Sequence, residues 1–186
     1  LCRCFRCMSC TNEGRFGGKR MVVQVVQDIL GFDPTIAVEY ATTPPSSWYR
    51  SADVLELEYR TVFTRNWIAV GPAQHVSRPG EYMTGQFGHE PFVVARDTDH
   101  TLRAFYNVCR HHAACIAEGR GVVDHFQCPY HGWRYALDGR LLKAPHVGPI
   151  KDFDPPSFGL IPIEVQTWQG IVFIHFGQPT DKPAQL

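Results

Sequence analysis

Two short segments, Asn107-Val-Cys109-Arg-His111-His112 and Cys128-Pro-Tyr-His131-Gly-Trp133, decide how this chain folds. Each segment pairs one cysteine with one histidine, as C-x-H in the first and C-x2-H in the second, and 16 residues separate the two motifs. Both motifs in this order and at this gap would arise by chance in roughly one of several hundred chains of this composition. Because thiolates and imidazoles bind transition metals, the pattern predicts a metal centre with the ligands Cys109, His111, Cys128 and His131.

The mixed ligand set favours an iron–sulfur cluster. Two thiolates can hold one iron of a [2Fe–2S] cluster, and two neutral histidine nitrogens on the other iron raise the reduction potential. Tetrahedral zinc, which also accepts two cysteines and two histidines, is the main alternative. A zinc finger, however, places its cysteines together and its histidines together, whereas each motif here contains one of each. We therefore expect a [2Fe–2S] cluster between two facing loops, close to the surface, and one-electron transfer as its role.

The sequence around the motifs predicts a mostly β fold. After Trp67, short segments rich in aromatic and β-branched residues alternate with turn formers such as Pro79-Gly80 and Asp138-Gly139. Many short strands with polar turns favour an antiparallel β-barrel or sandwich, with a small cluster-binding subdomain around the two motifs. The predicted strands are 67–70, 81–87, 92–96, 102–108, 133–135, 141–142, 161–168 and 171–176.

One amino-terminal helix is predicted before the strands. Ser51 is its expected N-cap, with Asp53 in the first turn. Apolar residues recur at helical spacing and predict one stripe along a helix, made of Leu55, Tyr59, Val62 and Phe63. Prolines precede the cap at 44–45 and favour an extended arm.

The first residues of the chain are basic and poor in acids, which is typical of an organelle transit peptide. Four cysteines near the start, Cys2, Cys4, Cys7 and Cys10, could instead hold a metal. No second ligand pair of a zinc ribbon lies nearby, so we favour the transit peptide. The chain starts at Leu1, and its first methionines are Met8 and Met21, which favours a fragment or a gene model with an uncertain start.

Charge and hydropathy argue against two classes of partner. The 18 basic and 18 acidic residues balance, which gives no electrostatic reason for binding nucleic acid or an anionic membrane. No segment reaches the roughly 18 consecutive apolar residues that a membrane-spanning helix needs. We expect neither nucleic acid nor a membrane as a partner.

Three further residues adjoin the expected ligands. His112 is expected to point away from the neighbouring ligand and to lie outside the ligand set, either behind the ligands or at the surface. Tyr130 and Trp133 either shield the cluster or only pack beside it. Cys115 is expected to be a small buried residue. The remaining histidines lack ligand spacing and are expected to be ordinary surface or core residues: His75, His89, His100, His125, His146 and His175.

The two motifs resemble the cluster loops of the Rieske non-haem iron oxygenases, most closely those of the plant choline monooxygenases. That family usually has arginine in the place of His112, whereas choline monooxygenases have histidine. Upstream segments, Phe32-Asp-Pro and Thr43-Pro-Pro-Ser-Ser-Trp-Tyr49, resemble the family's amino-terminal arm, so the resemblance covers about 32–177. Respiratory-chain Rieske proteins have a disulfide-forming cysteine in each loop. Tyr130 takes that position in the second loop, so the resemblance is to the oxygenase type.

The resemblance implies a Rieske-type [2Fe–2S] cluster on the four predicted ligands, with reduced ferredoxin as the electron donor. It implies a homo-oligomeric enzyme that oxidises choline towards betaine aldehyde in glycine betaine synthesis, in the chloroplast stroma or otherwise the cytoplasm. The family also needs a mononuclear Fe(II) held by two histidines and a carboxylate. After His131 this sequence has only His146 and His175, which lie far apart. We therefore expect no catalytic residue in this chain and place the Fe(II) in an absent carboxy-terminal domain.

The expected organisation has four parts. They are a leader (1–31), an arm and helix (32–66), the Rieske domain (67–178) and a truncated linker to the catalytic domain (179–186). A stand-alone Rieske-type ferredoxin is the alternative, although small carriers generally lack the arm and helix. An oxygenase with another substrate also remains open.

Overall fold

The computed structural model describes residues 25–148, 151 and 153–179 of the chain. The four amino-terminal cysteines, and residues 180–186 of the expected linker (179–186), lie outside the described residues. Contacts divide the described part into two units, 25–64 and 65–179, which are treated separately below. No helix within these described ranges combines the length and apolarity needed to cross a membrane.

The first unit is helical. It contains a helical segment at 25–30, the short 3-10 helices η1 (Val38–Tyr40) and η2 (Ser46–Tyr49), and the helix α2 (Ala52–Thr61). The predicted cap is confirmed, because the Ser51 hydroxyl accepts the backbone N–H groups of Asp53 and Val54, at 3.2 and 3.4 Å. A further 3-10 helix, η3 (Phe63–Arg65), follows α2.

The predicted apolar stripe lies only partly in α2, which ends at Thr61, before Val62 and Phe63. Val54, which lies outside that stripe, is the buried residue of the helix, whereas Leu55 is 44% and Val62 47% exposed. Helical spacing fits several faces of a short helix, and the packed face depends on the preceding segment. In this unit Val54 lines a hollow together with Trp48.

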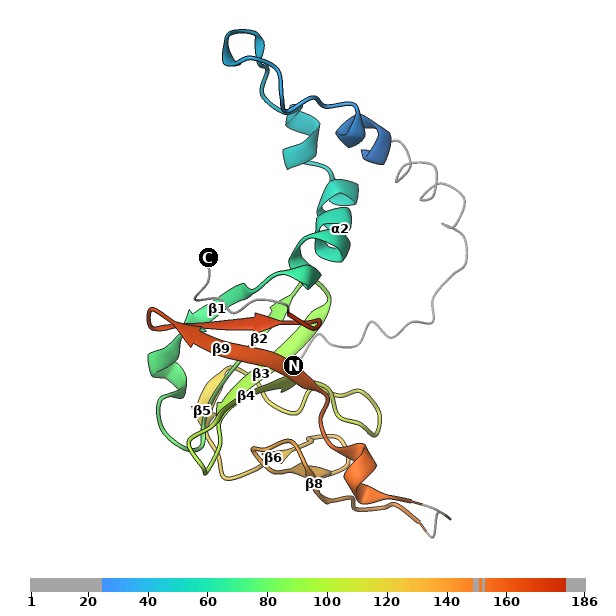
Figure 1. Cartoon of the computed structure of the whole chain (residues 1–186). Coiled ribbons are helices and arrows are strands. Elements are labelled where there is room, and N and C mark those ends of the chain that lie inside the picture. The colour runs from blue at the N-terminus through green and yellow to red at the C-terminus, as the bar shows by residue number, and fades with distance from the viewer. Residues whose placement is uncertain (1–24, 149–150, 152, 180–186) are drawn as a thin grey trace. The chain divides into compact units, whose positions relative to one another are not determined.

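The second unit is built on a curled antiparallel sheet of seven strands (Figure 1). Their order is β1-β10-β9-β4-β3-β2-β5, and the 3-10 helix η4 (Ala73–Val76) follows β1. The strands are β1 (Ile68–Pro72), β2 (Glu81–Phe87), β3 (Glu90–Arg96), β4 (Leu102–Tyr106), β5 (Arg120–Val122), β9 (Pro162–Trp168) and β10 (Ile171–His175). The mostly β, antiparallel prediction is confirmed.

A second, small sheet carries one of the two ligand motifs. It consists of β6 (Phe126–Gln127), β7 (Arg134–Tyr135) and β8 (Leu141–Lys143), and lies below the larger sheet in Figure 1. The 3-10 helix η5 (Pro155–Phe158) lies between β8 and β9 in the chain. Sequence analysis missed β5 and β6, because two or three residues are too few to show a strand periodicity.

Both faces of the large sheet are covered, and β3 shows this most clearly. Val93 and Ala95 belong to the core that also contains the two motif cysteines, whereas Phe92 and Val94 belong to a second core on the opposite face. Successive residues of a strand point to opposite faces, so four consecutive buried residues indicate two covered faces.

The turn between β7 and β8 requires a glycine. Gly139 follows Asp138 with φ of +90°, which an L side chain rarely adopts, and a Cβ there would lie 2.4 Å from the Phe105 ring. Gly139 N–H donates to the carbonyl of Ala136 and closes the turn at 3.0 Å. This turn brings the small sheet against β4.

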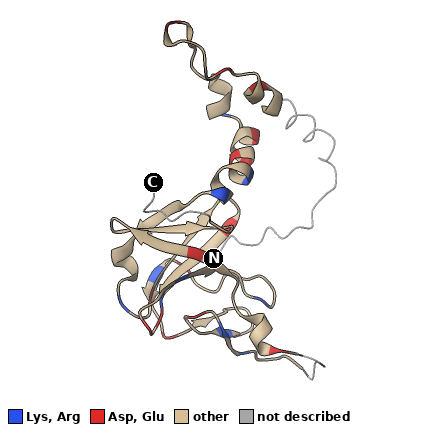
Figure 2. Ribbon diagram, in the orientation of Figure 1, with Lys and Arg blue, Asp and Glu red and all other residues tan. Residues whose placement is uncertain are grey.

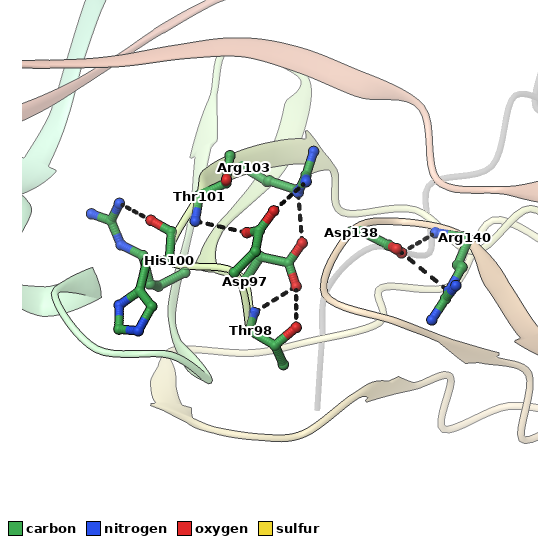
Figure 3. A network of polar contacts seen from close by, with 9 residues as sticks. Asp97, Thr98, His100, Thr101, Arg103, Asp138 and Arg140 are labelled. Carbon is green, nitrogen blue, oxygen red and sulfur yellow. Dashed lines mark hydrogen bonds and ion pairs between the residues drawn. The ribbon is translucent and has the colours of Figure 1, made fainter.

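The β3–β4 turn is held by a network of carboxylates (Figure 3). Asp97, which is 6% exposed, accepts hydrogen bonds from Arg103 Nε and from the Thr98 N–H, at 2.8 and 2.6 Å. Asp99 accepts a bond from the Thr101 N–H at 2.8 Å and pairs with Arg103 at 3.3 Å. The network fixes the start of β4, and the chain leaves β4 directly into the first ligand motif.

Candidate metal centre

The two ligand motifs lie on loops with the same backbone frame. In the first loop, between β4 and β5, Cys109 N–H donates to the Ala114 carbonyl at 2.8 Å, and Ala113 N–H donates to the Cys109 carbonyl at 3.0 Å. In the second, between β6 and β7, Cys128 N–H donates to the Trp133 carbonyl at 2.8 Å, and Gly132 N–H to the Cys128 carbonyl at 3.0 Å. Each loop therefore turns back on its own cysteine within five residues.

Both frames need a left-handed residue four positions after the cysteine. Ala113 has φ of 57° and Gly132 has φ of 71°. Glycine adopts this conformation readily, whereas an alanine is strained there. Strained backbone of this kind clusters at functional sites.

The Asn107 side chain links the start of the first loop to its later residues by hydrogen bonds. It is 4% exposed, and its Oδ1 accepts the N–H groups of Ile116 and Ala117 at 3.1 Å each. Its Nδ2 donates to the Ala117 carbonyl at 2.9 Å. The amide therefore satisfies three buried backbone groups and joins the two ends of the loop.

The two motif cysteines are buried together in the core. Cys109 is 3% exposed and Cys128 is 2% exposed. Burial raises the pKa of the Cys128 thiol, and the Cys109 thiol beside it acts in the same direction. Within the described ranges neither forms a disulfide. A buried pair of thiols favours a bound cation that replaces the protons.

Tyr135 is a neighbour of this pair that sequence analysis did not single out. Its hydroxyl lies 3.2 Å from Cys109 Sγ and accepts the Arg110 N–H at 3.0 Å, which leaves its own proton for the sulfur. Burial, with Cys109 adding to it, raises the pKa of Tyr135, so the phenol keeps this proton. In sequence, Tyr135 looks like any core residue of a strand, and no local signal marks its contact with Cys109.

Three histidine rings from the two ligand loops lie together. The centroids of His111 and His131 lie 4.8 Å apart, and those of His111 and His112 lie 3.8 Å apart. One nitrogen from each of the three rings lies within 4.8 Å of the others. The expectation that His112 points away was wrong. The chain turns at the left-handed Ala113 directly after His112, which keeps its ring beside the other two.

His111 is the histidine best suited to hold a metal. Its Nδ1 is buried and has no hydrogen-bond partner among the described residues. Burial, followed by the charges of His112 and His131, lowers the pKa of His111, which favours the neutral ring that binds metals. A buried ring nitrogen without a partner costs free energy unless a ligand satisfies it. The Nδ1 of His111 is therefore available to a metal, and the rings of His112 and His131 lie next to it.

Aromatic side chains flank the histidines on two sides. Trp133 is 2% exposed and stacks on His111, with centroids 4.7 Å apart and ring planes 4° apart. Tyr130 is 57% exposed and stacks on His131 at 3.9 Å. Trp133 thus covers the site towards the core, and Tyr130 lies on its solvent side.

The other expectations for this region concern Cys115 and the scattered histidines. Cys115 is buried, as expected. His75 lies beside Arg120, and His125 beside Asp124. His175 is buried, and its Nδ1 accepts a backbone N–H. In the described part of the chain, none of these histidines joins a group of potential metal ligands.

Comparison with known proteins agrees with this geometry. A family model described as "Rieske [2Fe-2S] domain" matches residues 66–154. This chain belongs to the Rieske family. The Rieske domain implies a [2Fe–2S] cluster as the cofactor.

The curated proteins that resemble this chain are named as monooxygenases, so the chain belongs to a family of oxidoreductases. Chloroplastic choline monooxygenase of Spinacia oleracea is 41% identical over 143 residues, which is 77% of this chain and 33% of that protein. The carnitine monooxygenase oxygenase subunit of Acinetobacter pittii is 34% identical over 75% of this chain and 38% of its own length. The chain thus spans about a third of the length of the curated relatives it matches.

Solved structures share the same fold. The apo form of a quaternary ammonium Rieske monooxygenase superposes with a TM-score of 0.72 at 32% identity. The match covers 76% of this chain and 41% of that one. The antiparallel core with its two loops is therefore the Rieske fold of oxygenases.

Proposed function

We propose that this chain is the electron-transfer part of a Rieske monooxygenase that acts on a quaternary ammonium compound. Its cluster ligands are Cys109, His111, Cys128 and His131. When bound, a cluster of this type supplies reversible one-electron storage. The observation that carries the proposal is the buried, unpartnered His111 Nδ1, whose ring centroid lies 4.8 Å from that of His131, on two loops that each bury their motif cysteine.

Each residue at the site has a physical task in this proposal. The two cysteines supply the thiolates for one iron, and the two histidines supply neutral nitrogens for the other. Tyr135 donates its proton to Cys109 Sγ and stabilises negative charge on that sulfur. The rings of Trp133 and Tyr130 restrict water around the histidines.

The extent of similarity favours an oxygenase over a stand-alone ferredoxin. The Rieske domain match covers 66–154, whereas the match to the Spinacia protein runs over 143 residues. The similarity therefore extends well beyond the domain that a small carrier would share. This supports an arm and helix (32–66) joined to the Rieske domain (67–178), and we further propose that 179–186 form a linker to a catalytic domain.

The finer parts of the proposal rest on the relatives. Choline, carnitine and glycine betaine, which the printed names of the relatives mention, all carry a quaternary ammonium group. By similarity we assign choline as the substrate and reduced ferredoxin as the donor, with the mononuclear Fe(II) in the rest of a homo-oligomeric enzyme. The chloroplast stroma is the assigned location, with residues 1–31 as the transit peptide.

Electron paramagnetic resonance on the purified, iron-reconstituted chain tests the cluster. We expect two irons and two sulfides per chain and, after reduction with dithionite, the rhombic spectrum of a Rieske centre. The spectrum of an all-cysteine cluster, or one zinc per chain, would overturn the proposal.

A test of the substrate assignment requires the full-length protein of the same gene. We expect oxygen consumption with choline, and little with a neutral isostere in which carbon replaces the ammonium nitrogen. Equal rates with both compounds would remove the quaternary ammonium assignment and leave the electron-transfer role intact.

A further inference from the structure

The outer face of the small sheet carries a row of three exposed polar residues. Gln127, Arg134 and Lys143 are register partners across β6, β7 and β8. All three are exposed, whereas the adjacent Phe126 and Tyr135 are buried. The row therefore points away from the core, and we call it the basic row.

The two cations of the basic row are not neutralised by the described part of the chain. Arg134 Nε donates to the Gln127 amide oxygen at 2.8 Å, and no ion pair involves Arg134 or Lys143 within these residues. Other arginines of this unit are paired, for example Arg103 with Asp97 and Arg140 with Asp138. Like charges opposite each other on neighbouring strands destabilise a sheet. The basic row therefore has an excess positive charge that an acidic partner would relieve.

The positive charge is local to the basic row. Residues 107–155, which include both ligand loops, the small sheet and the lining of the hollow, contain six basic and five acidic side chains. Two of those acids are already paired, Asp124 with His125 and Asp138 with Arg140. Figure 2 shows basic residues, in blue, on the ribbon of the small sheet.

A hollow of about 430 Å³, lined by polar and apolar groups in similar measure, adjoins the basic row. Lys143 stands at the hollow itself, among Leu141, Leu142, Ala144, Val147 and Phe153. Leu142 is 50% exposed. A cationic edge beside a depression with an exposed leucine is typical of a protein-docking surface, because charge orients the partner and apolar contact holds it.

This surface is coupled to the metal centre by two aromatic rings. Phe153 of the hollow packs edge-to-face on Trp133, with centroids 6.2 Å apart. Trp133 in turn stacks on His111 at 4.7 Å. A partner seated on the hollow would therefore lie two side chains away from a proposed cluster ligand.

We propose that the basic row and the hollow form the docking surface for an acidic electron-donor protein. The inference rests on the proposed electron-transfer function and adds the place and chemistry of the donor. The donor arrives with its one-electron centre reduced and leaves oxidised by one electron, which the Rieske centre accepts. No covalent bond forms or breaks. An acidic protein fits because it supplies both the carboxylates for the basic row and an apolar side chain for the hollow.

Charge neutralisation tests the surface. The probe is an acidic plant-type [2Fe–2S] ferredoxin, and calorimetry measures its dissociation constant with the reconstituted chain at low and at physiological ionic strength. The double variant Arg134→Gln/Lys143→Gln is expected to bind about tenfold more weakly at low salt and to lose most of the salt dependence. The variant Leu142→Ser should weaken binding at both salt concentrations, because it changes the apolar contact.

A matched control separates this surface from total charge. Gln74→Glu/Thr167→Glu changes the net charge by the same two units at exposed positions of η4 and β9. We expect its affinity to stay within twofold of the parent chain. Equal weakening by both double variants would overturn the docking surface, and so would unchanged binding by Arg134→Gln/Lys143→Gln.

Electron paramagnetic resonance distinguishes failure of the docking surface from failure of the proposed electron-transfer function. An unaltered rhombic spectrum in all variants shows that changes in affinity are not due to loss of the cluster. If the parent chain has the spectrum but does not bind the ferredoxin, the docking surface is wrong and the electron-transfer function stands. If the spectrum is absent from the parent chain, the proposed function fails and the docking surface fails with it.

Discussion

The first ligand loop and the second share one backbone frame, but they differ in the residues that occupy it. In both, the cysteine N–H donates to the carbonyl five residues on, and a left-handed residue stands four positions after the cysteine. That residue is Ala113 in the first loop and Gly132 in the second. The proposed histidine ligand is two positions after Cys109 but three after Cys128.

This difference shows that the groups that shape the loop are not the side chains proposed to bind the metal. The frame is made by backbone hydrogen bonds alone, so it tolerates a histidine at either position. Both loops nevertheless require a residue in the left-handed conformation four positions after the cysteine, and glycine adopts this conformation more easily than alanine. The first loop also has a second histidine, His112, at the position that corresponds to His131. The predictions below test this comparison, beginning with the largest expected effect.

The proposed histidine ligands should be equivalent despite their different positions in the frame. Replacing either His111 or His131 by alanine should abolish the [2Fe–2S] cluster, because one iron then loses half of its protein ligands. Iron analysis and the loss of the rhombic resonance after reconstitution measure this. Retention of a full Rieske spectrum in His111→Ala would assign the ligand role to His112 instead.

The left-handed positions should respond in opposite directions. Gly132→Ala should lower the free energy of unfolding by about 1 kcal/mol, because alanine is strained at positive φ. Space is not the cause, since a Cβ at this position would lie 3.8 Å from Pro145. Ala113→Gly should raise the free energy by about 0.5 kcal/mol, the strain relief minus the entropy cost of glycine.

Urea unfolding followed by circular dichroism measures both changes. Gly148→Ala is the control, because that glycine has open space around it and no positive φ in the range that disfavours L residues. A destabilised Ala113→Gly would show that the alanine side chain contributes packing that outweighs its backbone strain.

Only the first loop has a tyrosine hydroxyl on its cysteine sulfur. Tyr135→Phe should lower the reduction potential by about 40 mV, if the lost hydrogen bond favours the reduced state by about 1 kcal/mol. Spectroelectrochemical titration measures the shift. An unchanged reduction potential, with the cluster intact, would mean that the Tyr135 hydroxyl only accepts the hydrogen bond from the Arg110 N–H.

His112 should have the smallest effect of the set. His112→Ala should leave the iron content unchanged, because this ring is exposed and the buried nitrogen belongs to His111. The reconstituted variant and its parent are compared by iron analysis and by the resonance spectrum. Loss of half the iron would show that His112 takes part in binding.

Much of the fold could be predicted, because strand periodicity and turn residues are local. Glu81–Phe87 was predicted as a strand and is β2, and the Ser51 cap has the predicted hydrogen bonds. Short strands were missed where local patterning is too brief, as in β5 and β6. The buried residue of α2, Val54, could not be predicted, because a helix periodicity does not say which face packs against another segment.

The expected ligands could be named from the sequence because the spacing between metal-binding residues is a local feature of the chain. Cys109 and His111 differ by two positions, Cys128 and His131 by three, and chemistry limits what such pairs can bind. The relation of His112 to them could not be predicted, since it depends on the left-handed turn at Ala113. Tyr135 was missed for a similar reason, because its partner Cys109 is 26 residues away in the chain.

The sequence by itself determined the strand-rich class, the two motifs and the chemistry of their four side chains, since each of these depends on residue type and short spacing. Tertiary structure alone decided which groups meet. It brought the Tyr135 hydroxyl to Cys109, Trp133 onto His111, and Arg134 opposite Lys143. Such contacts join residues on different strands and loops, and their formation depends on how the two sheets and both loops pack, which no short stretch of sequence encodes.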